Sequence, residues 1–358
     1  MSRAGDPLLV LVTGGTGLVG HAVVEALDDA TVVSLTRGAG GDGRSRSGSA
    51  AGVVPETLRH AFTAGRSDSA THVQGDITAT RLGLAPADYE QLAAEVDVVV
   101  HAAGVSDFTT PLRTTHARNV EGTRQVLAFA ADADAAVYHV SSGYVNGRGT
   151  TVKGRWGAGV YLESKREAEA LAAASDRTAA VVRPSIVWGD SSTGRCPSFQ
   201  GLHRLVGMMF ESKLPLLPFG SDTRVDFLPC DVVGSTIAEL VRRRFEGEYW
   251  LTAGPAALEF GRIVELVLER GARFGLELHP PRFVDMDMID RLVRPVGGEA
   301  VSRRVDVMLA LTSHFTSQQL LPTSLAADAM PDVEAAFVRG VDYWAEQHGY
   351  AEAAEVRG

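Results

Sequence analysis

The feature that most constrains the fold is a continuous apolar run, residues 8–12, followed at once by a loop with three glycines. The run is β-prone and has no polar alternation, as expected of a strand buried on both faces of a parallel sheet. The loop, residues 13–20, has glycines at 14, 17 and 20 and leads into an amphipathic helix that continues to about Leu27. Such glycines allow a tight turn and close approach to a pyrophosphate, whose charge the helix N-terminus stabilises. The stretch therefore predicts a dinucleotide-binding unit, with a plain strand-to-helix turn as the alternative.

The second expected strand, residues 31–36, ends at Arg37, and this residue bears on which dinucleotide is bound. An acidic residue there would bind the ribose 2′-hydroxyl of NAD, whereas an arginine suits the 2′-phosphate of NADP. No Asp or Glu occurs between Asp29 and Asp42, so the sequence favours NADP(H). Arg37 could instead be a solvated loop charge. Arg44 and Arg46 could assist it from a Gly/Ser-rich stretch.

The first 190 residues alternate strands with helices. Further strands are expected at residues 70–74, 96–101, 136–140 and 179–182. Helices are expected between strands at residues 55–64, 112–131 and 158–174. Because parallel strands need crossover connections, this alternation predicts an α/β fold, a Rossmann-like doubly wound parallel sheet.

The alternation ends near residue 190. Helices are then expected at residues 201–210, 231–243 (with Asp231 as a cap), 259–270, 301–311 and 331–348. Short strands are expected at residues 224–229, 249–251 and 282–284. We therefore expect an NADP-binding Rossmann domain, residues 1–190 plus about 227–255, and a smaller, mostly helical C-terminal substrate-binding region, residues 191–226 plus about 256–358.

Small or polar residues follow the third and fourth strands, at the edge where open α/β sheets bind ligands. Asp76 is expected near an adenine, although a role as cap of the next turn explains it equally well. Ala102-Ala103-Gly104 forms a turn past which a cofactor can lie. Asn119, in the helix that follows, is expected to face solvent or bond the backbone.

Tyr161 and Lys165 lie four residues apart on the expected helix 158–174, so their side chains share one face. A nearby ammonium favours the phenolate and lowers a tyrosine pKa from its usual value of ~10, which allows proton transfer near neutral pH. Ser141-Ser142 ends the fifth strand, where a hydroxyl can hydrogen-bond a carbonyl on which negative charge grows. The spacing by itself is common, and the surrounding motifs decide its meaning.

The composition excludes several classes of protein. The 358 residues are 45% hydrophobic and carry a net charge of -10, which argues against a nucleic-acid surface. The two cysteines, Cys196 and Cys230, favour a reducing cytoplasm and supply no thiolate metal site. The histidines are scattered, so no metal is expected. No apolar run approaches the length that spans a bilayer, and we expect a soluble protein without a membrane.

With these residues assembled, the chain resembles the extended short-chain dehydrogenase/reductases. The matching motifs are the loop 13–20, Ser142, Tyr161 and Lys165. Within that superfamily the chain is similar to the thioester reductase and fatty acyl-CoA reductase branch, with its male-sterility-type NAD(P)-binding domain. The stretches that carry this similarity are Gly75-Asp76-Ile77 with Leu82-Gly83-Leu84, His101 to Val105, and His139 to Gly147.

The resemblance implies roles for individual residues. Tyr161 would be the general acid/base, Ser142 the donor to the carbonyl, and Lys165 the residue that holds the nicotinamide ribose and lowers the pKa of the phenol. The cofactor-binding residues implied are Thr13, Gly14, Gly15, Thr16, Gly17, Leu18, Val19, Gly20, Arg37, Asp76, Ile77, Ala102, Ala103, Gly104, Asn119, Tyr161, Lys165, Pro184, Ser185 and Val187. Candidates for substrate contact are Ser106, Gly143, Tyr144 and Arg224.

The leading hypothesis is NADPH-dependent reduction of an acyl thioester, on coenzyme A or a carrier protein, to an aldehyde and possibly on to the alcohol. No adenylation or carrier domain is attached, so a thioester delivered in trans is expected. The alternatives are an extended dehydrogenase or epimerase that acts on a ketone, an alcohol or a nucleotide sugar, and a cofactor-binding protein without activity. Arg224 could hold a phosphate in either enzyme, or form a surface ion pair with Asp222 or Asp226.

Overall fold

The protein is built around a parallel sheet of seven strands. The computed structural model describes residues 7–37, 70–147, 157–284 and 320–351. The strands lie in the order β11-β6-β5-β4-β1-β2-β3, and every neighbouring pair is parallel. Their bounds are β1 Leu9–Thr13, β2 Thr31–Thr36, β3 Thr71–Gln74, β4 Val98–His101, β5 Ala136–Val140, β6 Thr178–Pro184 and β11 Gly247–Leu251. The predicted Rossmann-like doubly wound fold is confirmed.

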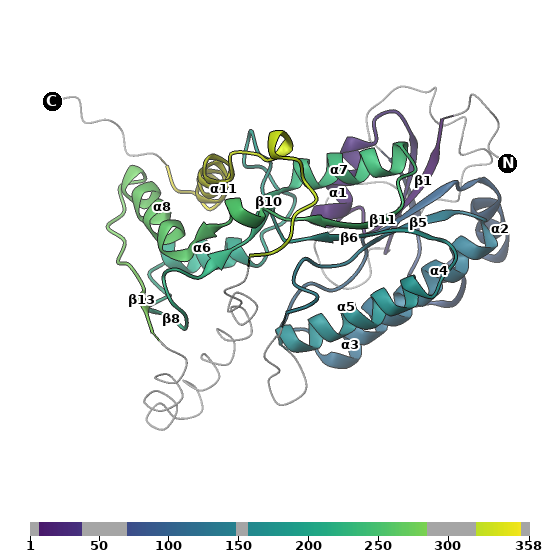
Figure 1. The fold of residues 1–358 in the computed structure, drawn as a ribbon, viewed down its shortest axis with the longest axis horizontal. Coiled ribbons are helices and arrows are strands. Elements are labelled where there is room, and N and C mark those ends of the chain that lie inside the picture. The colour runs from purple at the N-terminus through teal and green to yellow at the C-terminus, as the bar shows by residue number, and fades with distance from the viewer. Residues whose placement is uncertain (1–6, 38–69, 148–156, 285–319, 352–358) are drawn as a thin grey trace.

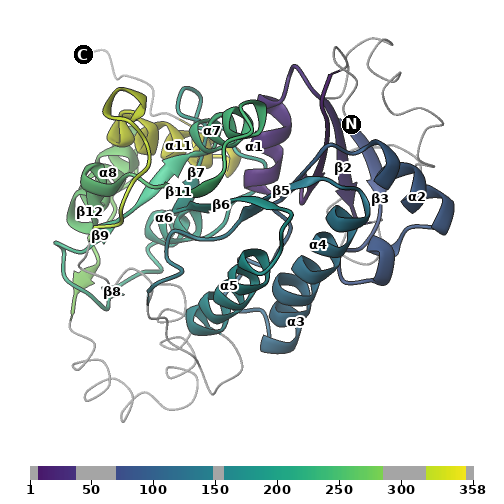
Figure 2. The ribbon, with the colours of Figure 1, turned by 45° about the vertical axis from the view of Figure 1, so that its right-hand side comes forward.

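Helices cover both faces of this sheet. Helices α1 (Leu18–Ala26) and α7 (Cys230–Arg242) lie on one face, and α4 (Gly122–Asp132) and α5 (Ala158–Ala173) lie on the other (Figures 1 and 2). Helix α2 (Pro86–Glu95) joins the second face, where the Tyr89 ring meets the Phe129 ring of α4 edge-on at 5.4 Å. The strand order reverses between β1 and β4, and ligands of such sheets bind at this point, outside the carboxyl ends of the strands.

The burial of β1 explains its continuous apolar sequence. Leu9 and Leu11 belong to the core under α4, whereas Val10 and Val12 belong to the core under α1 and α7. All four side chains are fully buried. Because successive strand residues point to opposite faces, a strand covered on both sides can have no polar alternation.

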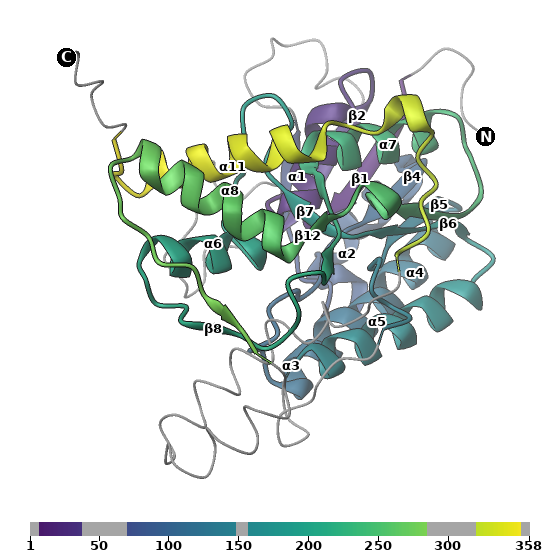
Figure 3. The same cartoon turned by 60° about the vertical axis from the view of Figure 1, so that its left-hand side comes forward.

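The second half of the chain packs onto the α1 and α7 side of the molecule. Its helices are α6 (Leu202–Phe210), α8 (Phe260–Arg273) and α11 (Val333–Gln347), which lie together in Figure 3. Short strands pair as β7 (Ile186–Trp188) with β10 (Phe227–Pro229), β8 (Leu216–Leu217) with β13 (Arg282–Phe283), and β9 (Arg224–Val225) with β12 (Leu258–Glu259). Single turns of 3-10 helix occupy Thr80–Gly83, Gly254–Ala256 and Ala327–Ala329.

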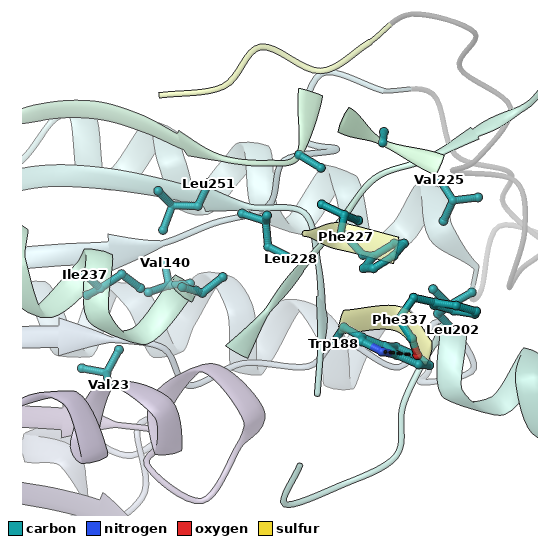
Figure 4. Close-up of a cluster of buried hydrophobic side chains, with 14 of the residues drawn as sticks. Val23, Val140, Trp188, Leu202, Val225, Phe227, Leu228, Ile237, Leu251 and Phe337 are labelled. Carbon is teal, nitrogen blue, oxygen red and sulfur yellow. Dashed lines mark hydrogen bonds between the residues drawn. The ribbon is translucent and has the colours of Figure 1, made fainter. Parts of the chain in front are cut away.

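One apolar cluster joins the sheet and its helices to the region of α6, α8 and α11. It contains Val23 of α1, Ile237 of α7, Trp188 of β7 and Phe337 of α11 (Figure 4). The Trp188 indole N–H donates to the Phe337 carbonyl at 3.3 Å, and the Trp188 ring stacks on His203 with centroids 3.9 Å apart. The expected substrate-binding region therefore shares a core with the sheet.

Two expectations need correction, and one helix was missed. The expected helix 112–131 is α3 (Leu112–His116), a π-helical turn (Ala117–Glu121) and α4. Asp231 does not cap α7; its carboxylate accepts hydrogen bonds from the Ser191 N–H at 2.8 Å and the Ser191 hydroxyl at 2.6 Å. Helix α2 was not anticipated.

The expected helices 55–64 and 301–311 lie outside the described residues. None of the described helices is both long and apolar enough to cross a bilayer.

Gly234 sets how closely α7 approaches α1. A Cβ at this position would lie 2.4 Å from the Ala22 carbonyl oxygen and 2.8 Å from the Ala22 Cβ. Alanine normally favours a helix over glycine by about 1 kcal/mol. Here we expect Gly234→Ala to lower the free energy of unfolding by about 1–3 kcal/mol, because α7 must move away from α1. Urea denaturation measures the change.

The matched control is Ser235→Ala, at the next residue of α7, whose side chain is exposed. This variant should stay within about 0.5 kcal/mol of the parent. An equal or higher stability of Gly234→Ala would contradict the proposed constraint.

Candidate functional site

The glycine loop and the Ala102-Ala103-Gly104 turn meet backbone to backbone at the β1–β4 switch point. Gly14 has φ +76°, and a Cβ there would lie 2.7 Å from the Ala103 nitrogen and Cα. A Cβ at Gly20 would lie 2.2 Å from the Gly14 carbonyl oxygen. Only glycine fits both the left-handed conformation and these distances. The loop leads into α1, whose N-cap, Gly17, supplies no side-chain cap, which leaves the first N–H groups of the helix available for an anion.

Three polar side chains lie in register beneath this loop. Thr13 of β1 pairs with His101 of β4, and His101 pairs with His139 of β5. All three are buried and point to the α4 and α5 face, since Leu11, Val99 and Val137 two residues earlier do so. The alternation of strand residues thus brings them together, although the sequence showed them only as scattered residues.

Hydrogen bonds select one tautomer of His101. The Thr123 hydroxyl donates to the Asn119 carbonyl at 2.7 Å, so it accepts from His101 Nε2 at 3.0 Å. His101 Nδ1 then accepts from the Thr13 hydroxyl at 2.7 Å, and the Thr13 oxygen accepts from the Ala103 N–H at 3.3 Å. Burial, with the charge of Lys165, lowers the pKa of His101 to about 3, so the ring is neutral. This network anchors the turn opposite the glycine loop.

Asn119 fastens the turn to α5. Its side-chain oxygen accepts from the Val105 N–H at 2.7 Å, and its amide donates to the Val105 carbonyl at 3.1 Å and to the Ser164 hydroxyl at 2.9 Å. The Ser164 hydroxyl donates to the Tyr161 carbonyl at 2.7 Å. Asn119 is therefore buried and bonds the backbone, the second of its two expected positions.

Ser142, Tyr161 and Lys165 converge at the carboxyl end of β5. The hydroxyls of Ser142 and Tyr161 are hydrogen-bonded to each other. Lys165 Nζ donates to the Val140 carbonyl at 3.0 Å and lies 3.8 Å from where a Cβ of Gly104 would be. The Phe108 ring packs against the Tyr161 ring, with centroids 5.3 Å apart. Sequence reasoning missed Phe108, which no spacing rule singles out.

The electrostatics of the pair differ from the expectation. Burial raises the pKa of Tyr161 above its ordinary value, and the hydrogen bond from Ser142 partly offsets this rise. The amino group of Lys165 is hydrogen-bonded elsewhere, to the Val140 carbonyl. Burial lowers the pKa of Lys165 to about 8, against the opposing charge of Glu169. Tyr161 is consequently a protonated phenol at neutral pH.

The two residues expected around the adenosine half lie at the ends of β2 and β3. Arg37 is exposed at the end of β2. Asp76 Oδ1 accepts from both the N–H and the hydroxyl of Thr78 at 2.8 Å, so it caps the next turn. Burial opposes ionisation of Asp76, but the Thr78 bonds and then the charges of Arg37 and Arg118 hold its pKa below the usual value. Ile77 packs against Gly122 of α4 and supports this edge.

The residues expected at the nicotinamide and substrate side adjoin the trio through backbone contacts. The Gly143 N–H donates to the Pro184 carbonyl at 2.6 Å, and the Ser185 N–H donates to the Leu251 carbonyl at 2.9 Å. The Tyr144 hydroxyl donates to the Asp226 carbonyl at 2.8 Å. Val187 lies one strand further out, paired in register with Leu228 of β10.

Asp226 was missed as an organising residue. Its buried carboxylate accepts from the N–H groups of Ala253 and Gly254, both at 2.8 Å, and so ties β10 to the end of β11. Burial raises the pKa of Asp226, against the opposing effect of these two bonds. Only the tertiary structure brings these segments together.

Arg224 and Ser106 bond to residues outside the trio. Arg224 donates to the Ala257 carbonyl at 2.7 Å and forms an ion pair with Glu259 at 3.0 Å. Neither Asp222 nor Asp226 is its partner, which corrects the expected ion pair. The Ser106 hydroxyl donates to the Gln200 side chain at 2.9 Å, linking the loop after β4 to the segment before α6. The described residues contain no cluster of metal ligands.

The family model described as male sterility protein, an NAD-binding domain, matches residues 12–237. The chain belongs to this family. The match includes the glycine loop and all three residues of the trio, and the predicted resemblance to the thioester reductase and acyl-CoA reductase branch of the extended short-chain dehydrogenase/reductases is confirmed.

Two curated relatives illustrate the family. The chain is 30% identical over 229 residues to the hybrid PKS-NRPS synthetase mpsA of Macrophomina phaseolina, covering 56% of this chain and 5% of that protein. It is 32% identical over 154 residues to the putative fatty acyl-CoA reductase CG8306 of Drosophila melanogaster, covering 40% of this chain and 30% of that protein. The chain thus spans a minor part of each relative.

Solved structures share the fold. The terminal R domain from the myxalamid PKS-NRPS pathway superimposes with a TM-score of 0.68 at 20% identity, covering 99% of this chain and 94% of that one. The thiolation-reductase di-domain of an archaeal non-ribosomal peptide synthetase gives 0.66 at 17% identity, covering 97% and 78%. The UDP-glucuronic acid 4-epimerase of Bacillus cereus, solved with NAD, gives 0.59 at 17%, covering 95% and 100%.

The residues present fit a nicotinamide dinucleotide. The Gly14–Ala103 backbone contact and the uncapped start of α1 form a cradle that any side chain at Gly14 would disturb. Lys165 Nζ and the Ser142 and Tyr161 hydroxyls lie along the same edge of the sheet, at the carboxyl end of β5.

Replacement of Gly14 tests this cradle. We expect Gly14→Ala to weaken binding of the dinucleotide about tenfold or more, because the new Cβ collides with the Ala103 backbone. Titration of intrinsic fluorescence with the reduced cofactor measures the affinity. Gly349→Ala is the control, since Gly349 has φ +84° but open space around it, so it has the strain without the collision. Equal affinities in the two variants would contradict this assignment.

Proposed function

We propose that the protein is an NADPH-dependent reductase that converts an acyl thioester to an aldehyde. The observation that carries the proposal is the trio of Ser142, Tyr161 and Lys165, brought together within the segment that matches the family. The thioester class is supported by the relatives, which include a fatty acyl-CoA reductase and R domains of PKS-NRPS systems. A second reduction to the alcohol remains part of the same proposal.

Ser142 and Tyr161 would bind the carbonyl oxygen of the thioester. Because their hydroxyls already lie within hydrogen-bonding distance of each other, one oxygen atom can contact both. Two donors aimed at the same oxygen stabilise the negative charge that grows there. The raised pKa of Tyr161 keeps its proton in place until that charge develops, as a general acid requires. The reduced nicotinamide supplies the hydride.

The product then leaves by collapse of the tetrahedral adduct. Hydride on carbon and a proton on oxygen turn the thioester into a hemithioacetal. Its C–S bond breaks, the hydroxyl proton is lost, and the sulfur takes up a proton, which gives aldehyde and thiol. Lys165, buried beside the turn at Gly104, would hold the ribose and contribute positive charge during the proton transfer.

We infer that the acyl group arrives on coenzyme A or on a carrier protein. This inference draws on the thiolation-reductase di-domain and on the PKS-NRPS relatives. The protein would act in the cytoplasm, which the free thiols of Cys196 and Cys230 support. The sheet with its flanking helices would bind the dinucleotide, and α6, α8 and α11 would cover the substrate.

Turnover of thioesters tests the proposed reaction. With NADPH and a panel of short, long and aromatic acyl-CoA and acyl-carrier substrates, we expect aldehyde and free thiol in equal amounts. Tyr161→Phe should lower kcat about 10²- to 10⁴-fold while the cofactor still binds, because only the proton donor is removed. Turnover of ketones or nucleotide sugars without any thioester would instead establish the alternative dehydrogenase or epimerase.

Cofactor preference tests Arg37, which we propose as the contact to the 2′-phosphate. A charge-assisted bond is worth about 1.5–3 kcal/mol, so Arg37→Ala should raise the KM for NADPH about 10- to 100-fold. The KM for NADH should change little, since NADH has no 2′-phosphate. Arg124→Ala, an arginine of α4 paired with Glu121 on the surface, is the control. An unchanged KM for NADPH in Arg37→Ala would remove this role.

A further inference from the structure

The amino group of Lys165 is buried with little to compensate its charge. Its Nζ donates to one neutral acceptor, the Val140 carbonyl, at 3.0 Å. Taking an ammonium out of water costs several kcal/mol unless an opposite charge compensates it. Burial accordingly lowers the pKa of Lys165 to about 8. Above this pH most of the lysine is neutral and no longer supplies a positive charge.

Glu169 is the carboxylate that opposes this effect. It follows Lys165 by four residues on α5, so both side chains lie on the same face of the helix. Among the charged groups of the described residues, Glu169 is the one whose charge raises the pKa of Lys165. Its side chain is 16% exposed, which leaves little water to screen the attraction.

Arg183 holds the Glu169 carboxylate in place. The guanidinium of this β6 residue donates to both oxygens of Glu169, at 2.9 and 2.8 Å, and to Glu248 of β11 at 2.6 Å. It also lies over the Trp250 ring, 4.9 Å from the ring centroid. Two carboxylates around one guanidinium leave the group with one net negative charge, which complements the ammonium of Lys165.

Within the described residues, the other titratable groups near Lys165 carry no charge. On β4 and β5 these are His101 and His139, and on α5 it is Tyr161. Burial lowers the pKa of His101 to about 3 and that of His139 well below its usual value. Both rings are therefore neutral, and neither nitrogen of His139 has a hydrogen-bond partner in the described part of the chain.

We propose that Glu169 is a positioning residue for the reaction: its carboxylate, held by Arg183 and Glu248, keeps Lys165 as an ammonium at the carboxyl end of β5. The electrostatic part of this proposal stands on the charges around Lys165. Its catalytic consequence rests on the proposed function. The Glu169–Arg183 pair also joins α5 to β6, so the test must separate a charge effect from a structural one.

The composition of the chain allows Lys165 to be observed directly. There are three lysines, Lys153, Lys165 and Lys213. Protein labelled with ¹³C at lysine Cε therefore gives three Cε signals, which Lys153→Arg and Lys213→Arg variants assign. Titration of the Lys165 signal in the free protein measures its pKa without cofactor or substrate. We expect a value near 8 in the parent.

Glu169→Gln should lower the pKa of Lys165 by about 1 unit or more, because an opposite charge is lost. Glu167→Gln is the matched control: Glu167 lies on α5 but is exposed and pairs with His116, so the Lys165 signal should titrate as in the parent. Glu248→Gln keeps both buried partners and removes an exposed carboxylate, and it should shift the pKa in the same direction by less.

An unchanged pKa of Lys165 in Glu169→Gln would overturn the proposal. If that variant does not fold, an unchanged pKa in Glu248→Gln would overturn it. The pH profile of kcat/KM gives a second readout, since its alkaline limb should move to lower pH in Glu169→Gln and stay in place in Glu167→Gln. If the parent reduces no thioester, the proposed function fails, whereas the NMR titration still decides the role of Glu169.

Discussion

Coverage of both faces of the central sheet is the constraint on which the rest of the structure depends. Strands buried on two sides can contain few polar groups, so polar chemistry is confined to their carboxyl ends. Thr13, His101, Ser142 and Ser185 all lie where a strand ends or has just ended. The parallel register then aligns these ends along one edge of the sheet. A reactive site arises there because that edge is the place where side chains and backbone N–H groups remain available.

The chemistry of the site depends on the protonation states of its buried side chains. Tyr161 stays protonated because burial disfavours the phenolate. Burial also disfavours the ammonium of Lys165, so its pKa lies below that of a lysine in water. Burial keeps His101 neutral, and hydrogen bonds with Thr13 and Thr123 select its tautomer. The acidic partner of Lys165 lies behind the site, in the Glu169–Arg183–Glu248 group, rather than beside the reacting atoms. This arrangement separates the groups that would contact substrate from the group that sets their charge.

Much of the sheet could be predicted because its signals are local. The apolar run of β1, the glycines of the loop and the strand ending in Ser141-Ser142 each express a short-range rule. The errors concern contacts between segments far apart in the chain. Asp231 was expected to cap its own helix but binds Ser191, and Arg224 was expected to pair with Asp222 or Asp226 but pairs with Glu259. The pKa of Tyr161 was also expected to be lowered but is raised by burial, since helical spacing fixes which face two side chains share but not how deeply that face is buried.

By itself the sequence determined the alternation of the sheet strands with most of their helices, the dinucleotide loop and the residue types available for proton transfer, because apolar periodicity and glycine conformation are properties of neighbouring residues. The tertiary structure decided which of those residues meet. It placed His101 beneath the glycine loop, directed the Asp226 carboxylate to the end of β11, and set Arg183 against Glu169. Hydrogen-bond partners, burial and therefore pKa depend on packing between distant segments, and no local pattern encodes that packing.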